Sequence, residues 1–170
     1  MKTMLTILAI AFPVAIIAIP AQASVPTGDF DGDGRSDVFW RNVSTGANSI
    51  WKSANIMTPQ RVVSVTNLHW YIAGQGDFDG DGRADVFWRN ADTGANVIWK
   101  SANRAKLQSA RGVTDLQWKV VGVGDFNGDG QSDVLWRHSA SGRNAIWLSG
   151  RFETPQAMTA VTDVRWKVAG

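Results

Sequence analysis

The sequence predicts an all-β fold made of three four-stranded sheets. Two observations predict it: a unit of 48 residues occurs three times in succession, and each unit contains four short stretches rich in β-branched and aromatic residues. Repeats of about 40–50 residues with four strands each are typical of β-propeller blades. We therefore predict three propeller-type blades, forming a propeller that is partial or completed by oligomerisation. A β-solenoid is the alternative, although its coils are usually shorter.

The first half of each unit carries the clearest repeat. The segment GDFDGDGRSDVFWRN at residues 28–42 returns as GDFDGDGRADVFWRN at 76–90 and as GDFNGDGQSDVLWRH at 124–138. The first two units are identical at 30 of 48 positions. We place the units at about residues 27–74, 75–122 and 123–170, within one repeat domain of residues 24–170.

Residue types within a unit predict the individual strands. Residues 38–42 combine valine with two aromatic residues, and a Ser-Thr-Gly turn at 44–46 separates them from a second strand at 48–52. Valines predict a third strand over 61–66, and residues 70–73 form the fourth. Valine, isoleucine and aromatic residues favour strands, whereas serine and glycine favour turns.

Composition excludes several classes of site. The 170 residues include no cysteine, so disulfides, thiolate zinc sites and cysteine nucleophiles are excluded. Eleven of the fourteen aspartates lie in three short clusters, whereas lysine and arginine are spread along the chain. A nucleic-acid interface requires basic residues gathered on one face, so we expect no nucleic-acid partner.

Residues 1–23 have the pattern of a secretory signal peptide. Lys2 supplies a positive charge, residues 4–20 are apolar, and Ala21-Gln22-Ala23 fits a small-residue cleavage site. Pro13 and Pro20 interrupt the apolar stretch, which argues against an uncleaved membrane anchor. We expect a mature chain with no membrane span, located in the periplasm, at the cell surface or in the medium.

The aspartate clusters predict calcium loops. In the first cluster, oxygen-bearing side chains stand at loop positions 1, 3, 5 and 9, and a glycine stands at position 6. Calcium takes six to eight oxygen ligands, and the glycine allows the sharp turn that gathers them. The first slots are similar to an EF-hand loop, but tryptophan replaces the glutamate at position 12. Asn127 removes one charge from the third loop, so we expect that loop to bind calcium more weakly.

These loops resemble the FG-GAP/VCBS type of calcium-binding repeat, found in integrin α-chain propellers and bacterial secreted proteins. The resemblance covers the whole repeat domain. It implies about three Ca²⁺ sites, each in a loop that joins the innermost strand of a blade to the next strand out. The implied ligands, with backbone carbonyls at position 7, are Asp29, Asp31, Asp33, Arg35 and Asp37; Asp77, Asp79, Asp81, Arg83 and Asp85; and Asp125, Asn127, Asp129, Gln131 and Asp133.

Three blades fall short of a closed propeller, which has about four to eight. Residues 166–170 match an innermost strand for which no further blade follows in the sequence. The matching position before the first loop falls in the predicted signal peptide. We expect either self-association that closes a ring of two chains, or a fragment of a larger propeller.

The tryptophans do not identify a ligand. Each unit has three, and they either fill the space between blades or present rings to sugars. Trp51, Trp99 and Trp147, with the recurring Asn48, Asn96 and Asn144, form a possible sugar contact. The same asparagines also suit turn geometry. We expect His69 and His138 to be exposed, because other residues replace both in the other units.

No catalytic motif is present, so we expect a protein that is not an enzyme. The sequence favours a secreted, calcium-stabilised, lectin-like or adhesive module that recognises glycans or a surface protein. The alternative is a structural or accessory segment without a ligand of its own.

Overall fold

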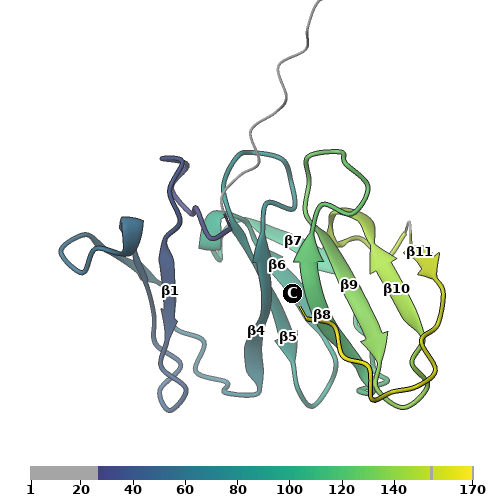
Figure 1. Ribbon diagram of the computed structural model, residues 1–170. Coiled ribbons are helices and arrows are strands. Elements are labelled where there is room, and N and C mark those ends of the chain that lie inside the picture. The colour runs from purple at the N-terminus through teal and green to yellow at the C-terminus, as the bar shows by residue number, and fades with distance from the viewer. Residues whose placement is uncertain (1–26, 154, 170) are drawn as a thin grey trace, which may run out of the picture.

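The computed structural model describes residues 27–153 and 155–169. The predicted signal peptide lies outside these residues. Three antiparallel sheets stand side by side in chain order (Figure 1). The only helical elements in the described residues are single 3-10 turns at Lys52–Ala54, Lys100–Ala102 and Leu148–Gly150. The all-β prediction is confirmed, with blade-like sheets that do not close into a ring.

The first sheet contains three strands in the described part of the chain. They are β1 (Val38–Arg41), β2 (Asn48–Trp51) and β3 (Pro59–Val62), in that order. β3 pairs with β2 from Pro59 opposite Trp51 to Val62 opposite Asn48. The third strand therefore begins and ends earlier than the valine pattern predicted. Turn hydrogen bonds then occupy part of the expected span, because Val65 donates its N–H to Gly46.

The second and third sheets each have four strands. The second runs in the order β4 (Trp70–Gly76), β5 (Asp85–Asn90), β6 (Asn96–Trp99) and β7 (Leu107–Ala110). The third repeats this order with β8 (Trp118–Gly124), β9 (Asp133–His138), β10 (Asn144–Trp147) and β11 (Pro155–Met158). The fourth stretch of the first and of the second sequence unit thus forms the first strand of the next sheet.

The core lies between neighbouring sheets. Trp88 of the second sheet packs edge-on against Phe39 of the first, with ring centroids 6.4 Å apart. Phe87, on the opposite face of β5, packs against Trp136 of the third sheet at 6.1 Å. Side chains alternate between the two faces of a strand, so β5 supplies an aromatic side chain to each of the two neighbouring sheets. This packing explains why both faces of β5 are aromatic.

The residues after β11 do not form a strand in the described part of the chain. Residues 166–169, which match the start of β4 and β8, have no sheet partner. Trp166 is 69% exposed, whereas its counterparts Trp70 and Trp118 are half-buried. None of the described helices is long and apolar enough to span a membrane.

Candidate metal centres

Each aspartate loop lies at one end of a sheet. The second loop connects β4 to β5, and the third connects β8 to β9. The first loop leads into β1. The resemblance placed the loops between the innermost strand and the next strand out, and the second and third sheets confirm this placement.

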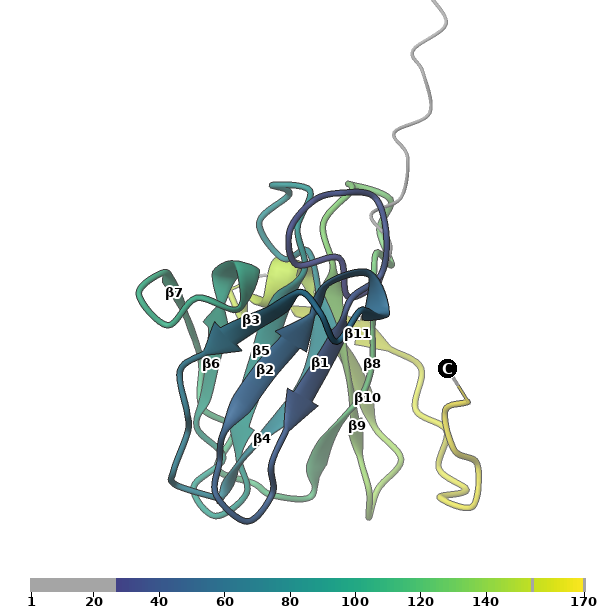
Figure 2. The same cartoon turned by 90° about the vertical axis from the view of Figure 1, so that its left-hand side faces the viewer.

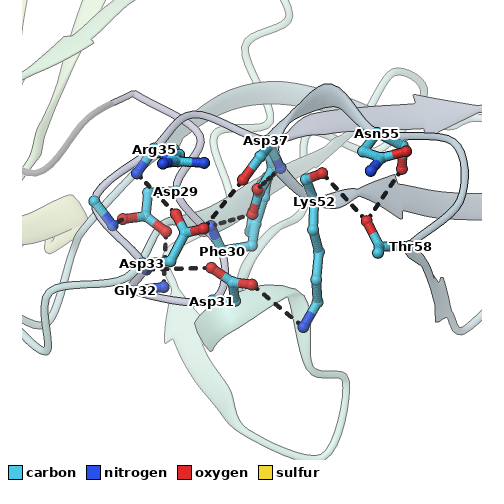
Figure 3. A network of polar contacts seen from close by, with 12 residues as sticks. Asp29, Phe30, Asp31, Gly32, Asp33, Arg35, Asp37, Lys52, Asn55 and Thr58 are labelled. Carbon is cyan, nitrogen blue, oxygen red and sulfur yellow. Dashed lines mark hydrogen bonds and ion pairs between the residues drawn. The ribbon is translucent and has the colours of Figure 1, made fainter.

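Aspartate side chains hold the first loop in a tight coil (Figure 3). Asp29 accepts hydrogen bonds from the backbone N–H groups of Gly32 at 2.7 Å and Gly34 at 2.8 Å, one on each carboxylate oxygen. Asp31 accepts one from Asp33, and Asp33 accepts one from Arg35. Asp77 and Asp125 bind the equivalent N–H groups in the other loops. Alternate side chains of each loop therefore point toward its centre.

The aspartate at position 9 ties each loop to the rest of its sheet. One oxygen of Asp37 accepts the N–H of Phe30 at 2.9 Å, and the other accepts the N–H of Ser53 at 2.7 Å. Asp85 and Asp133 make the same pair of contacts. The serine has a positive φ in each 3-10 turn. Position 9 thus anchors the loop as well as offering oxygen atoms to it.

Carboxylates converge in two of the three loops. Oxygen atoms of Asp29, Asp31 and Asp33 lie within 4.8 Å of one another. Those of Asp77, Asp79 and Asp85 do the same. An all-oxygen donor set of this density suits Ca²⁺, which needs more ligands than Mg²⁺ and tolerates irregular geometry. The residues present therefore fit a calcium ion.

The third loop differs from the other two. Its Asn127 turns its amide N–H₂ toward Asp129, whose oxygen it meets at 3.0 Å. Residues 125–130 are exposed, whereas Asp29 and Asp77 are buried. At position 7, Arg35, Arg83 and Gln131 donate their backbone N–H groups to the aspartate two residues earlier. Coordination by their carbonyls stays a prediction.

A lysine that the sequence reasoning missed lies at two of the loops. The ammonium of Lys52 is 3.3 Å from Asp31 (Figure 3), and that of Lys100 is 3.0 Å from Asp79. The third unit has Leu148 at this position, where the loop has Asn127 in place of aspartate. The extra aspartate and the lysine occur together, so their charges offset each other, but Arg35 and Arg83 stand at position 7 where the third loop has Gln131. The third loop therefore carries the more negative net charge, and its weaker calcium binding stays a prediction.

Burial changes the proton affinity of two position-9 carboxyls, those of Asp85 and Asp133. Loss of water contact raises the pKa of Asp85 to about 7, with smaller contributions in the same direction from the charges of Asp79 and Asp77. Burial also raises the pKa of Asp133. Without a cation, these carboxyls hold protons more tightly than an exposed aspartate does.

The six predicted ligand-binding residues lie largely inside the fold. Trp99 and Trp147 are buried and Trp51 is half-buried. Asn96 accepts a hydrogen bond from Arg89 at 3.1 Å and donates one to the backbone oxygen of Arg111. Asn48 and Asn144 make equivalent bonds. Their contact with sugars stays a prediction.

The expectation of two exposed histidines was wrong for His138. Its ring is buried, stands edge-on to Trp118, and accepts the backbone N–H of Ser141 at 3.1 Å. In the other units, Asn42 and Asn90 accept the equivalent turn N–H groups. A histidine can replace asparagine here because its ring nitrogen serves as the same acceptor.

A groove lies between residues 64–67, which follow β3 of the first sheet, and the strands of the second sheet. Trp70, Trp99 and Leu107 supply apolar surface, and Asn67 and Arg104 supply polar groups. At the next junction, Phe152 stands where the groove has Arg104 and packs against Trp147, with centroids 5.4 Å apart. The two junctions therefore differ although their strands repeat.

Comparison with known proteins gives one match. A search of curated proteins and a search of solved structures returned no match. Residues 77–136 match the family model described as an FG-GAP-like repeat. The matched segment runs from the second aspartate loop, through β5 to β8, to the middle of β9. The chain thus contains an FG-GAP-like repeat, set within three blade-like sheets.

Proposed function

We propose that this protein is a secreted, calcium-stabilised propeller-type module that binds carbohydrate. The FG-GAP-like match and the blade-like sheets support the propeller-type part. Calcium is supported by the converging carboxylates, which repel one another unless a cation joins them. Asp29, Asp31, Asp33 and Asp37, with their counterparts, would hold the ion, and the ion would fix each loop to its sheet.

Location outside the cytoplasm is supported by the N-terminal sequence and by the chemistry of the site. Residues 1–23 have the three-part pattern of a signal peptide. Extracellular calcium modules bind with dissociation constants of about 10⁻⁴–10⁻³ M, which suits calcium-rich surroundings. Detection of the mature N-terminus at Ser24 in the secreted protein would support this part. Retention of residues 1–23 on an intracellular protein would contradict it.

The binding part depends on the groove beside Trp70. An aromatic ring offers a flat apolar surface to the C–H face of a sugar, and Asn67 and Arg104 are placed to meet hydroxyl groups at its rim. Arg104 and Leu107 are exposed, so a ligand reaches them without rearrangement of the core. This groove carries the proposal, because it combines aromatic and polar groups on an accessible surface.

A panel of immobilised oligosaccharides, probed in calcium, tests the proposal. We expect saturable binding to at least one sugar, and about tenfold weaker binding after Trp70→Ala or Arg104→Ala. Arg151→Ala is the matched control, because Arg151 is exposed and lies outside the groove. Binding that survives both groove substitutions, or no binding across the panel, would contradict a carbohydrate role for the groove.

One observation favours the accessory role instead. Most of the repeated tryptophan and asparagine side chains are used within the fold, between sheets or beneath turns. Repetition of these residues then serves blade packing. A folded, calcium-loaded protein that binds no oligosaccharide of the panel would favour the accessory role.

A further inference from the structure

The two end sheets expose faces that are covered elsewhere in the chain. In the first sheet, which faces the viewer in Figure 2, alternation along the chain places Ser36, Val38 and Trp40 on the side away from the second sheet. We call this side the Trp40 face. On its opposite side the third sheet carries Phe126, which is exposed, together with Leu135 and Arg137, which are buried and share a pocket with residues 166–168 of the same chain. We call this side the Phe126 face. No described segment forms a sheet against either face.

The same two kinds of face meet twice within the chain. Arg41 lies over the ring of Trp88, and Arg89 lies over the ring of Trp136, each with its guanidinium carbon 5.0 Å from the ring centroid. Trp88 and Trp136 are both 1% exposed. The residues at these junctions are the 48-residue counterparts of Trp40 and Arg137.

The exposed fractions of two aromatic side chains show that the end faces lack the cover that their counterparts have. Trp40 is 49% exposed, although it has the same place in its strand as Trp88. Phe126 is 48% exposed, whereas its counterparts Phe30 and Phe78 are almost fully buried. A tryptophan and a phenylalanine are thus left open at opposite ends of one chain.

Backbone groups show the same complementarity. Ala84 donates its N–H to the carbonyl of Asp29, and Ser132 donates its N–H to the carbonyl of Asp77, which joins neighbouring loops. The next pair in this series is the N–H of Ser36, on the Trp40 face, and the carbonyl of Asp125, beside the Phe126 face. Among the described residues, no hydrogen bond joins those two groups.

Among the described residues no strand pairs with the outer edge of β1, and this edge matches residues 166–169, which have no sheet partner. β4 pairs with β5 with Trp70 opposite Asn90 and Ile72 opposite Trp88, and β8 pairs with β9 in the same register. Shifted by one repeat, this register sets Trp166 opposite Asn42 and Val168 opposite Trp40. These segments belong to opposite ends of the molecule.

Arg137 supplies a second sign of the missing strand. Arg41 donates to the carbonyl of Trp70 at 3.0 Å, and Arg89 donates to that of Trp118 at 3.3 Å. Arg137 keeps the bonds to Gly142, Asn144 and Val161 but has none to Trp166. Trp166 is therefore displaced from the position that its counterparts hold.

We propose that the Phe126 face of one copy of this chain binds the Trp40 face of a second copy, head to tail. Residues 166–169 of the first copy pair with β1 of the second and complete its sheet to four strands. Arg137 then lies over the partner's Trp40, and Phe126 becomes buried. Two copies joined at both faces supply six blades, within the range of about four to eight seen in closed propellers.

Light scattering after size exclusion, on the purified protein in calcium, tests the proposal. We expect a discrete particle of twice the chain mass. Trp40→Asp and Phe126→Asp should each give monomers, because either charge would be buried without a partner. Val43→Asp is the control, since Val43 is 80% exposed at a turn outside both faces. Because Trp40 and Phe126 are both exposed, their substitutions should leave the fold intact, which circular dichroism checks.

Mixing the two variants distinguishes head-to-tail contact from other dimers. The Trp40→Asp chain keeps an unaltered Phe126 face, and the Phe126→Asp chain keeps an unaltered Trp40 face. An equimolar mixture should therefore form a one-to-one dimer through one interface. A monomeric wild-type protein, dimeric variants, or no dimer in the mixture would overturn the proposal, and larger assemblies would overturn closure by two copies. The groove beside Trp70 lies within one chain, so sugar binding succeeds or fails independently.

Discussion

Arg89 of the second sheet lies over the indole ring of Trp136 of the third, 5.0 Å from its centroid. Its guanidinium also donates to the carbonyls of Gly94 and Val113 at 3.0 Å each, and its side chain is 2% exposed. One buried cation thus binds a turn of its own sheet and an aromatic ring of the next. Burial lowers the pKa of this arginine, but it stays charged.

Arg89→Met should destabilise the protein by about 2–4 kcal/mol, because it leaves buried carbonyl groups without a donor. Urea unfolding in saturating calcium measures this. Arg151→Met removes an exposed arginine and should change the free energy of unfolding by less than about 0.5 kcal/mol. Equal effects of the two substitutions would show that Arg89 does not hold the sheets together.

Gly94→Ala should destabilise more than Gly82→Ala. Both glycines have positive φ, which costs a non-glycine residue about 1 kcal/mol or more. A Cβ at Gly94 would stand 1.9 Å from the carbonyl oxygen of Val113, whereas a Cβ at Gly82 would have no heavy atom within 4 Å. We expect a difference of at least about 1 kcal/mol in urea unfolding. Equal losses would mean that backbone conformation alone requires glycine at residue 94.

Lys100→Met should strengthen calcium binding by the second loop about tenfold, which corresponds to ~1.4 kcal/mol. The ammonium lies 3.0 Å from Asp79 and opposes the charge of an incoming cation. Competition with a chromophoric calcium chelator measures the affinities.

Leu148→Lys is the reverse substitution and should weaken the third loop. Lys106→Met is the control, because Lys106 is exposed and has no carboxylate partner within ion-pair distance in the described residues. Unchanged affinity in Lys100→Met would show that Lys100 does not compete with the ion.

The calcium-free protein should lose stability as pH rises from about 4 to 7. Asp85 has a pKa of about 7 in the folded protein against an ordinary 3.8, so between these values the folded state holds a proton that the unfolded chain has released. Stability then falls as pH rises, because the unfolded state binds fewer protons. Urea unfolding in a chelator at pH 5 and pH 8 checks the sign.

Two comparisons isolate the contribution of Asp85. Asp85→Asn should reduce the difference in stability between pH 5 and pH 8. Calcium affinity should rise with pH over the same window, because the ion displaces the proton. A calcium affinity that is independent of pH would contradict the burial argument for this carboxyl.

Repetition made much of the fold predictable from the sequence. A glycine-aspartate loop followed by Val-Phe-Trp-Arg, or Val-Leu-Trp-Arg in the third unit, recurs at a fixed spacing. The strands expected in the first unit therefore predict those of the others, except that residues 166–169 form no strand. The alignment of units places the start of the counterpart of β4 for the first sheet within the predicted signal peptide, outside the described residues. The placement of aspartates around each loop follows from alternate spacing and glycine turns, and the hydrogen bonds of Asp29 bear out that coil.

Contacts between sheets could not be predicted in the same way. Alternation indicates that Arg41 and Trp40 point to opposite faces, but it does not say that Arg41 reaches the ring of Trp88 in the next unit. The lysine at the loop was missed for a similar reason, since Lys52 follows Asp31 by 21 residues and meets it only after the sheet forms. The sequence offered one signal for this contact: an aspartate at loop position 3 occurs with a lysine 21 residues later, whereas Asn127 occurs with Leu148.

The most direct test of the account is thermal unfolding of the purified protein, compared between 5 mM calcium and excess chelator. This calcium concentration is about fivefold above the dissociation constants of the weakest extracellular sites. If calcium holds the aspartate loops to the sheets, the melting temperature should fall by ten degrees or more in chelator, in line with a ligand that binds only the folded state. It should recover when calcium is restored, and magnesium should not replace it. An unchanged melting temperature would contradict the account.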